Sequence, residues 1–483
     1  MFAVRFVLCF DCRVSEPPAP PPPSYEELVA ENAQLRALLL QALGEIEQLK
    51  ARLGMTSKNS SQPPSSDGLA KPAPKSLRGK SKRGPGRPEG QMGFTLPLAD
   101  DPDHEQVHEP SMCCGCGAGL EGADLAGTER RQVFDLPPLR LEVTEHRLIS
   151  RRCSCGVITK ADTPAGVNAP VQYGPRLAGV GVYLFHGQFL SRSRTCQALA
   201  DLFGAPVAAS TVVSWVRQVA AQITAKVLPG ILDRIAASPV AHFDETGFRT
   251  AGSLHWMHSA STATDVLLTV HRRRGTKGMD AAGVLPRFQG TAVHDAWAPY
   301  DTYTDATHAL CNAHALRELI YVIDTAPAPV AALATQGTEA MVALKDLIDN
   351  ARAVGVDPDP DQLATQQHLL RSAFVLGKSA TTGRASKLEC KYNALFTRLI
   401  QRWDDYQRYI HDPHTPWDNN AAEQTIRMPK LRIKVSGCLR TLTGAEEFAA
   451  IRSYTATAVR NGQNMLDVLI HAADNNPWGQ ATT

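Results

Sequence analysis

Hydrophobic residues recur with a heptad period from Tyr25 to Leu53, which predicts a long helix with one apolar face. A single polar residue, Asn32, takes a core position, where it would fix the register and the number of chains in a coiled coil. Ser24 and Glu27 have the spacing of a capping box. We therefore predict a coiled coil over 24–54 that joins copies of the chain; an amphipathic helix packed on its own chain is the alternative. The two series of core positions are Tyr25, Asn32, Leu39, Ile46 and Leu53, and Leu28, Leu35, Ala42 and Leu49.

After residue 239 the period of the apolar residues shortens to two, which is typical of β-strands. The segments PVAHFDETGF, SLHWMHSAS and TDVLLTVHRRR read as three strands, and GTAVHDAW reads as a fourth after the helix-like KGMDAAGVLPRF. A helical pattern then extends over about residues 309–410. Asp244 and Asp295 end two of the strands, and Glu423 begins the helix that follows the long helical stretch.

The order of these acids is that of a ribonuclease-H-like core, in which two acids on neighbouring strands and one on a helix converge. Three carboxylates supply hard oxygen ligands for two Mg²⁺ or Mn²⁺ ions, about 4 Å apart, which stabilise both in-line oxygens in phosphoryl transfer. We therefore predict that Asp244, Asp295 and Glu423 are catalytic metal ligands. Each acid alone also fits an exposed strand end or a helix start, and Glu245 and Asp418 are the nearest rival ligands.

Residues 195–220 have the rhythm of a helix-turn-helix. Leu199 and Leu202 would lie on the first helix, Gly204 near the turn, and Ser210 at the start of the second helix. Two ordinary packed helices are the alternative. The polar face of the predicted recognition helix consists of Thr211, Ser214 and Arg217.

Four cysteines occur in spacings that suit a metal. Cys113 and Cys116 form a C-x2-C pair, and Cys153 and Cys155 form a C-x-C pair. The segment between them, RQVFDLPPLRLEVTEHRLISRR, alternates well enough for two strands. Four thiolates fit tetrahedral Zn²⁺, and because sulfur fills every position we expect a structural ion. Cys114 is a spare ligand, and reduced cysteines without metal are the alternative.

A second set of metal-ligand types, His308, Cys311 and His314, falls three residues apart, roughly on one face of a helix. Three ligands on one helix are cramped for tetrahedral zinc. We expect them to pack and to contact substrate beside Asp295.

The composition fits a soluble protein of two to four domains. The chain has 483 residues, 43% hydrophobic and 20% charged, and no apolar run of the roughly 18 residues that span a membrane. The apolar start MFAVRFVLCF is short and runs into a proline tract, so we interpret it as a disordered tail rather than a signal peptide. The odd count of 11 cysteines and their metal-like spacing favour the reducing cytoplasm.

The net charge is only +2, so a nucleic-acid interface must be local. Residues 71–90 hold seven Lys or Arg against one acid, and residues 424–460 hold seven against two. Such segments bind phosphate backbones without sequence preference, and a solvated basic surface is the alternative for each. The candidate DNA contacts are Lys80, Lys82, Arg83 and Arg87 in the first segment, and Arg427, Lys430, Arg432 and Lys434 in the second.

Together these patterns predict a multidomain α/β protein. Its ribonuclease-H-like catalytic core has a large helical insertion and is preceded by a coiled coil, a small zinc finger and a helix-turn-helix-like helical region. The predicted segments are a disordered tail over 1–23, the coiled coil over 24–54, a basic disordered linker over 55–98, a four-Cys zinc-binding domain over 99–160, DNA-binding helices over 170–235, the catalytic domain over 236–460 with its insertion at about 309–410, and a C-terminal helix and tail over 461–483.

Several motifs in order resemble transposases of the insertion sequence 66 family. They are the heptad helix, SKNSSQPPSSD, the basic linker, the four-Cys finger, HFDETGF, HDAWAPY, LCNAHALREL, DNNAAE and IKVSGCLRTLTGAEEFAAIRSY. The resemblance implies a DDE core whose acids are Asp244, Asp295 and Glu423. It also implies cutting and joining of DNA at terminal inverted repeats, with Mg²⁺ or Mn²⁺ in the core and structural Zn²⁺ in the finger.

The resemblance further implies terminal-repeat DNA and target DNA as partners, a homo-oligomer held by the coiled coil, and a place at the nucleoid in the bacterial cytoplasm. It allows accessory proteins encoded by the same element, and it implies no membrane. The sequence has no P-loop, and strand transfer is nearly isoenergetic, so no need for ATP is implied. Two other functions stay open: an inactive or repurposed zinc-containing DNA-binding protein, and a stand-alone metal-dependent nuclease.

Overall fold

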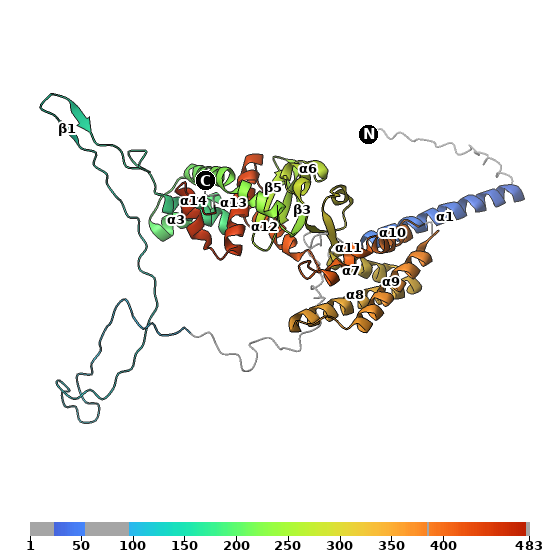
Figure 1. Cartoon of the computed structure of the whole chain (residues 1–483), viewed down its shortest axis with the longest axis horizontal. Helices are drawn as coiled ribbons and strands as arrows, with labels where there is room; N and C mark the ends of the chain where they lie inside the picture. The colour runs from blue at the N-terminus through green and yellow to red at the C-terminus, as the bar shows by residue number, and fades with distance from the viewer. Residues whose placement is uncertain (1–23, 54–95, 384–385, 480–483) are drawn as a thin grey trace, which may run out of the picture. The chain divides into compact units, whose positions relative to one another are not determined.

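The computed structural model describes residues 24–53, 96–383 and 386–479 (Figure 1). The predicted tail over 1–23 and most of the predicted linker over 55–98 lie outside the described residues.

The chain forms two compact units. The helical unit contains the N-terminal helix and Leu310–Asp418, and the sheet unit contains Pro72–Ala309 and Asn419–Thr483. In the part of each unit that the structure describes, no helix is long and apolar enough to cross a membrane.

The helical unit is built from helices that pack in sequence order. α7 packs on α8, α8 on α9 and α9 on α10, around buried residues such as Leu344, Phe374 and Phe396. The long helical stretch is confirmed, except that its first helix begins at Asn312 rather than near residue 309. The helices are α7 (Asn312–Thr325), α8 (Ala328–Val354), α9 (Pro360–Thr381), α10 (Lys387–Gln401) and α11 (Trp403–His411).

The N-terminal helix α1 (Tyr25–Leu53) begins with the predicted capping box. The backbone N–H of Ser24 donates to Glu27 Oε2 at 2.7 Å, and the backbone N–H of Glu27 donates to Ser24 Oγ at 3.2 Å. Its leucines from Leu28 to Leu49 are exposed, Leu39 by 60%. A row of exposed leucines is a surface that a second helix can cover. Self-association through this helix stays a prediction.

A five-stranded sheet forms the centre of the sheet unit, in the order β5-β4-β3-β6-β7. β4 pairs antiparallel with β3 and with β5, whereas β6 pairs parallel with β3. The four predicted strands are confirmed; β7 was missed because four residues show too little of a period of two. The strands are β3 (Val240–Thr250), β4 (Ser253–Ser261), β5 (Val266–His271), β6 (Thr291–His294) and β7 (Thr307–Leu310).

Helices from both ends of this unit share one hydrophobic cluster with the sheet. Val216, Ile223 and Ile235 from the N-terminal side meet Phe243 of β3 and Tyr454 near the C-terminus in this cluster. The same core therefore contains residues from both sides of the predicted domain boundaries at 235 and 460. The division into domains stays a prediction. The helices are α2 (Pro175–Val182), η2 (Tyr183–Gly187), α3 (Arg192–Phe203), α4 (Ala209–Lys226), α5 (Leu228–Ala236), α6 (Thr276–Ala282), η3 (Leu285–Arg287), η4 (Ala298–Thr302), α12 (Asn420–Ser436), α13 (Leu442–Arg460) and α14 (Met465–Ala473).

Helix α13 covers the outer edge of β5 with hydroxyl groups. Ser453 Oγ accepts the backbone N–H of Leu268 at 2.8 Å, and Thr457 Oγ1 accepts that of Val266 at 3.0 Å. The spacings match, because four helical residues rise about 6 Å and two strand residues about 6.6 Å. Unpaired N–H groups on an edge strand would otherwise be open to pairing with another chain.

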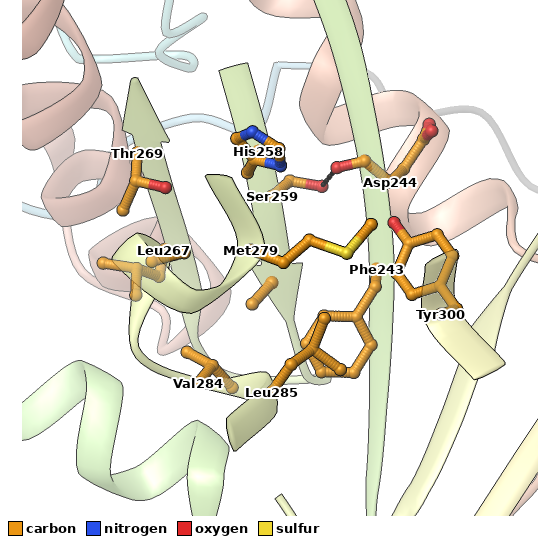
Figure 2. Close-up of a pocket in the computed structure, with 12 residues that line it drawn as sticks. Phe243, Asp244, His258, Ser259, Leu267, Thr269, Met279, Val284, Leu285 and Tyr300 are labelled. Atoms are coloured by element: carbon orange, nitrogen blue, oxygen red, sulfur yellow. Dashed lines mark hydrogen bonds between the residues drawn. The ribbon is translucent and has the colours of Figure 1, made fainter. Parts of the chain in front are cut away.

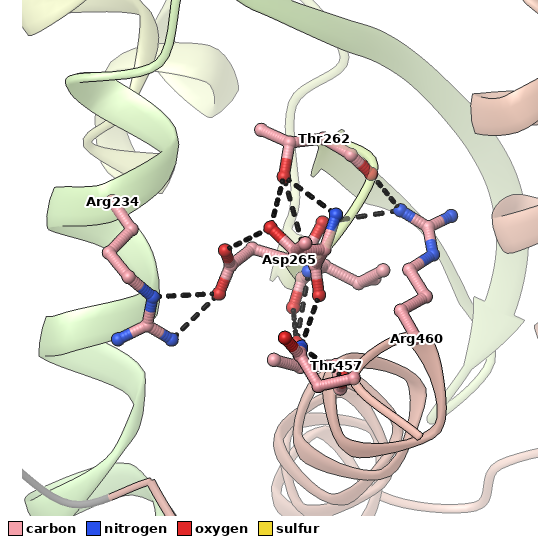
Figure 3. Close-up of polar contacts among 8 residues, drawn as sticks. Arg234, Thr262, Asp265, Thr457 and Arg460 are labelled. Carbon is pink, nitrogen blue, oxygen red and sulfur yellow. Dashed lines mark hydrogen bonds and ion pairs between the residues drawn. The ribbon is translucent and has the colours of Figure 1, made fainter. Parts of the chain in front are cut away.

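Polar contacts also hold the turn between β4 and β5 (Figure 3). The buried carboxylate of Asp265 accepts hydrogen bonds from Arg234 Nη2 and Nε of α5, at 2.7 and 3.0 Å. Arg460 of α13 donates to the carbonyl of Thr262, and its Nη2 donates to Thr425 Oγ1 of α12 at 3.1 Å. The turn is thus held between α5 and α13, and α12 is joined to α13.

Of the segment 131–152, predicted to form two strands, only the last three residues form a strand, β1 (Ser150–Arg152). Residues 131–149, all of them described, contain no strand, and Val133 and Val143 are 93% and 88% exposed. An alternating pattern forms a strand only when another surface covers its apolar face, and these valines have no such cover within the described chain.

Both cysteine pairs nevertheless lie in tight turns. β1 (Ser150–Arg152) and β2 (Ile158–Lys160) form an antiparallel hairpin whose turn carries Cys153 and Cys155. Backbone hydrogen bonds also close a turn directly after Cys113.

We predict that Thr457→Val lowers the free energy of unfolding by about 1–3 kcal/mol, because it leaves the buried N–H of Val266 without an acceptor. Thr455→Val is the matched control on α13, since the Thr455 hydroxyl donates only within its own helix. Urea unfolding of both variants measures the difference. Equal losses would contradict the role assigned to the edge contact.

Candidate active site

The parallel register of β3 and β6 brings two of the predicted acids together. The last pair in this register is His242 with Val293. Two residues further along both strands, the register puts Asp244 beside Asp295. The sequence could not show this pairing, because it depends on which strands become neighbours.

Asp244 does not end its strand, contrary to the prediction. β3 continues to Thr250 and stays paired with β4, where Ser259 lies opposite Asp244. The continuation buries Phe248 in a second hydrophobic cluster. Only the pairing with β6 stops near Asp244, so the acid lies at the point where one edge of β3 loses its partner.

Asn419 ties the start of α12 to β3. Its side chain is buried; Nδ2 donates to the carbonyl of Phe243 at 2.8 Å, and Oδ1 lies 2.8 Å from His242 Nδ1. A buried amide that is bonded at both ends has a fixed orientation. Because α12 begins at Asn420, this contact holds its first turn, which carries Glu423, against β3.

Glu423 lies in the first helical turn, as predicted. Its side chain is 14% exposed, and Oε2 lies 3.3 Å from Nη2 of Arg427, one turn along α12. An acid in this position interacts favourably with the helix dipole, which is the ordinary explanation for its presence.

Four acids share one electrostatic environment: Asp244, Glu245, Asp295 and Glu423. The pKa of Asp244 is raised well above its ordinary value, first by burial and then by the negative charges of the other three. On α12, burial lowers the pKa of Lys430, while the charges of Asp244 and Glu423 oppose that change. The site therefore concentrates negative charge in a buried region, which favours a bound cation.

Glu245 is an alternative metal ligand that the sequence also allowed. Both of its carboxylate oxygens accept hydrogen bonds from other side chains. Arg274 donates from Nη2 and Nε to Oε1 at 2.6 and 2.7 Å, and Tyr300 donates to Oε2 at 2.6 Å. The guanidinium of Arg274 also lies 3.9 Å from the ring of Trp297. The sequence did not predict the contacts of Arg274 and Tyr300 with Glu245, because these residues are 29 and 55 positions away from it. Tyr300 is the last residue of the HDAWAPY motif, and that motif could have indicated it.

His294 supports Asp295 from the end of β6. Its Nδ1 is hydrogen-bonded to the backbone carbonyl of Asp295, and its Nε2 lies 2.9 Å from His308 Nδ1. The ring stacks on Tyr300 with centroids 4.3 Å apart. His308 lies in β7 and not in a helix. The prediction that it shares one helical face with Cys311 and His314 is wrong.

A small pocket lies behind Asp244 (Figure 2). Its volume is about 20 Å³, which holds a water molecule but no nucleotide. Figure 2 shows Asp244 and Tyr300 at one end, with Leu267 and Val284 toward the other. The pocket therefore belongs to the packing of the sheet, and any molecule larger than water must approach the acids from outside it.

Among the described residues, no three His, Cys, Asp or Glu side chains are arranged to ligate one ion. The backbone N–H and then the thiol of Cys116 lower the pKa of Cys113, and those of Cys155 lower the pKa of Cys153. The two thiols of each pair are therefore close. No third ligand joins either pair within the described chain.

The predicted DNA contacts lie in different environments. On α4, Ser214 and Arg217 are exposed and Thr211 is half-buried; Arg217 Nε lies 3.7 Å from Glu447 Oε1. On α12, Arg427 and Lys434 are exposed, Lys430 is half-buried and Arg432 is buried. The four linker candidates, Lys80, Lys82, Arg83 and Arg87, lie outside the described residues.

Three family models match the chain. The model of the transposase IS66 family matches residues 170–447, which is more than half of the sequence. The zinc-finger binding domain of transposase IS66 matches residues 110–156, and a family of unknown function, DUF6444, matches residues 15–95. No curated protein matches the sequence.

A sheet with two adjacent, half-buried aspartates, preceded by two turns that carry cysteines, is thus found in a transposase with a zinc-finger domain. The chain belongs to the IS66 transposase family. Membership implies DNA as the partner, zinc for the finger and a divalent metal for the transposase domain.

Proposed function

We propose that this protein cuts DNA at the terminal inverted repeats of an insertion sequence and joins the ends to target DNA. Asp244, Asp295 and Glu423 are its catalytic carboxylates, in a core of the ribonuclease-H-like type. The observation that supports the proposal is that two contacts between distant parts of the sequence bring the three acids into one region. The register of β3 and β6, continued two residues past its last pair, puts the two aspartates side by side. Asn419 holds the turn that carries Glu423 against β3.

The carboxylate set fits Mg²⁺ or Mn²⁺, which prefer hard oxygen ligands. Burial raises the pKa of Asp244, and repulsion from the neighbouring acids raises it further; a divalent cation would relieve that repulsion. When bound, a pair of such ions supplies positive charge to the transferring phosphoryl group and lowers the pKa of the attacking water or 3′-hydroxyl.

The chain's own groups orient the acids and the DNA. Asn419 fixes the first turn of α12. Arg274 and Tyr300 occupy both carboxylate oxygens of Glu245, so that this residue does not bind metal. Lys430 lies near the acids, where its charge can neutralise a DNA phosphate next to the one that reacts.

The remaining segments serve DNA binding and assembly in this proposal. Zn²⁺ joins Cys113, Cys116, Cys153 and Cys155 in one structural finger. The exposed face of α4 and the basic linker contact the element's ends in the cytoplasm, and α1 joins copies of the protein.

We predict that Glu423→Gln lowers end cleavage and joining by about two orders of magnitude or more with Mg²⁺, since a metal ligand contributes several kcal/mol to transition-state stabilisation. Binding to the element's ends persists. If Glu423 only complements the helix dipole, about 0.3–1 kcal/mol is lost and activity barely changes.

The assay is cleavage of a labelled end duplex beside a gel-shift control. Asp418→Asn is the matched variant. A Glu423→Gln protein that cuts at a near-normal rate, while Asp418→Asn does not cut, would transfer the role to Asp418. Wild-type protein that binds ends but never cuts them would favour a repurposed DNA-binding protein.

For the finger, we predict one Zn²⁺ per chain and loss of that zinc in Cys153→Ser, because three thiolates and a hydroxyl close the site less well. Cys114→Ser keeps the metal. Metal analysis of protein purified under reducing conditions tests both variants, and zinc-free wild-type protein would refute the finger.

For assembly, we predict that a peptide of residues 24–54 self-associates through its exposed leucines, and that Asn32→Leu changes the number of chains. Sedimentation equilibrium measures both. A monomeric peptide, together with an unchanged full-length oligomer after deletion of the segment, would remove α1 from assembly.

A further inference from the structure

Glu245 and Asp244 are neighbours on β3 and therefore point to opposite faces of the sheet. His242 shares the face of Asp244, and its Nδ1 lies 2.8 Å from Asn419 Oδ1, so this face is the one toward the start of α12. Glu245 lies behind it, with only 1% of its side chain exposed. Burying a carboxylate is unfavourable, so its place behind the site needs a reason other than metal binding.

The side chains that bind Glu245 hold residues 295–300, the segment that follows β6. Tyr300, at the end of this segment, donates to Glu245 Oε2 at 2.6 Å. Arg274 donates to Oε1 from Nη2 and Nε, at 2.6 and 2.7 Å, and its guanidinium lies 3.9 Å from the ring of Trp297. Glu245 therefore holds the segment at two points, in its middle and at its end.

The same segment orients the carboxylate of Asp295. The backbone N–H of Trp297 donates to Asp295 Oδ1 at 3.1 Å, so a movement of Trp297 also moves a donor that holds the acid. The ring of His294 stacks on Tyr300 with centroids 4.3 Å apart, and its Nδ1 is hydrogen-bonded to the carbonyl of Asp295. Contacts from both ends of the hold on Glu245 thus lead to Asp295.

We propose that Glu245 and Arg274 are positioning residues for Asp295. The carboxylate of Glu245 fixes the guanidinium, the guanidinium packs on Trp297, and the N–H of Trp297 orients the acid. The ring of Trp256 on β4 lies 5.1 Å from the same guanidinium and restricts it further. Mg²⁺ demands near-ideal octahedral geometry, so it binds better to a carboxylate held in one orientation. This inference rests on the proposed function, because it takes Asp295 as a metal ligand.

The test measures Mn²⁺ binding to the full-length protein by isothermal titration calorimetry, and end cleavage as a function of Mg²⁺ concentration. Glu245→Gln/Arg274→Met removes the guanidinium together with the charge that it neutralises, so no buried charge is left unpaired. We expect the dissociation constant for Mn²⁺ and the half-saturating Mg²⁺ concentration to rise about tenfold. The cleavage rate at saturating Mg²⁺ should stay within about threefold of the wild-type rate, because all three carboxylates remain.

Two control proteins accompany this variant. Glu245→Gln alone keeps both contacts, since an amide oxygen accepts from Arg274 and an amide N–H donates to Tyr300, and its Mn²⁺ affinity should stay within about threefold of the wild type. Asp265→Asn/Arg234→Met makes the same kind of change in the buried acid–arginine pair that holds the turn between β4 and β5. Its Mn²⁺ affinity should equal that of the wild type.

A further variant separates positioning from stability. Trp297→Leu leaves the pair of Glu245 and Arg274 in place but removes the ring on which the guanidinium packs, and it should also weaken Mn²⁺ binding about tenfold. Thermal unfolding without metal shows how much stability each variant loses. Unchanged Mn²⁺ affinity in Trp297→Leu and in the double variant would overturn the inference, and so would an equal loss of affinity in the control pair. Loss of Mn²⁺ binding in Glu245→Gln would make Glu245 a ligand and overturn it as well.

End cleavage by the wild type distinguishes this role from the proposed function. Cleaving wild-type protein, beside variants with unchanged metal constants, refutes the positioning role alone. Wild-type protein that binds Mn²⁺ more tightly than the double variant but never cleaves DNA refutes the catalytic function and leaves the positioning role. Wild-type protein that binds no Mn²⁺ and never cleaves refutes both.

Discussion

The buried side chain of Asn419 is the contact on which the rest of the site depends. It joins α12 to β3 across 177 residues of sequence, through His242 and the carbonyl of Phe243. The first turn of α12, which carries Glu423, takes its place from this contact. The second anchor of the helix is the bond from Arg460 to Thr425, which links it to the helix that covers β5.

Charge is distributed along α12 in a way that a helix of purely structural use would not need. Its first turn contributes an acid to a region that is already negative, and its last turns place cations where burial penalises them. Each cluster is unfavourable by itself, and each becomes favourable when it binds a charge of opposite sign. Divalent cations would meet the first requirement, in agreement with the proposed function.

The sequence predicted elements better than contacts. A period of two predicted four of the five strands of the central sheet, and the order of three acids indicated the candidate site without any knowledge of strand pairing. Local patterns could not show that β3 continues past Asp244, because that depends on the burial of Phe248. They also could not show the clamp of Arg274 and Tyr300 on Glu245. The strands expected between the cysteine pairs were wrong, because alternation gives no strand without a surface to cover it.

The central claim is that Asp244, Asp295 and Glu423 hold the catalytic metal ions. A crystal structure of the protein bound to its cleaved end DNA and Mn²⁺, with an anomalous difference map, tests it most directly. The account predicts manganese peaks at about 2.0–2.3 Å from carboxylate oxygens of all three residues, with Glu245 still bonded to Arg274 and Tyr300. Manganese ligated by Glu245 or Asp418, with Glu423 turned away, would contradict it.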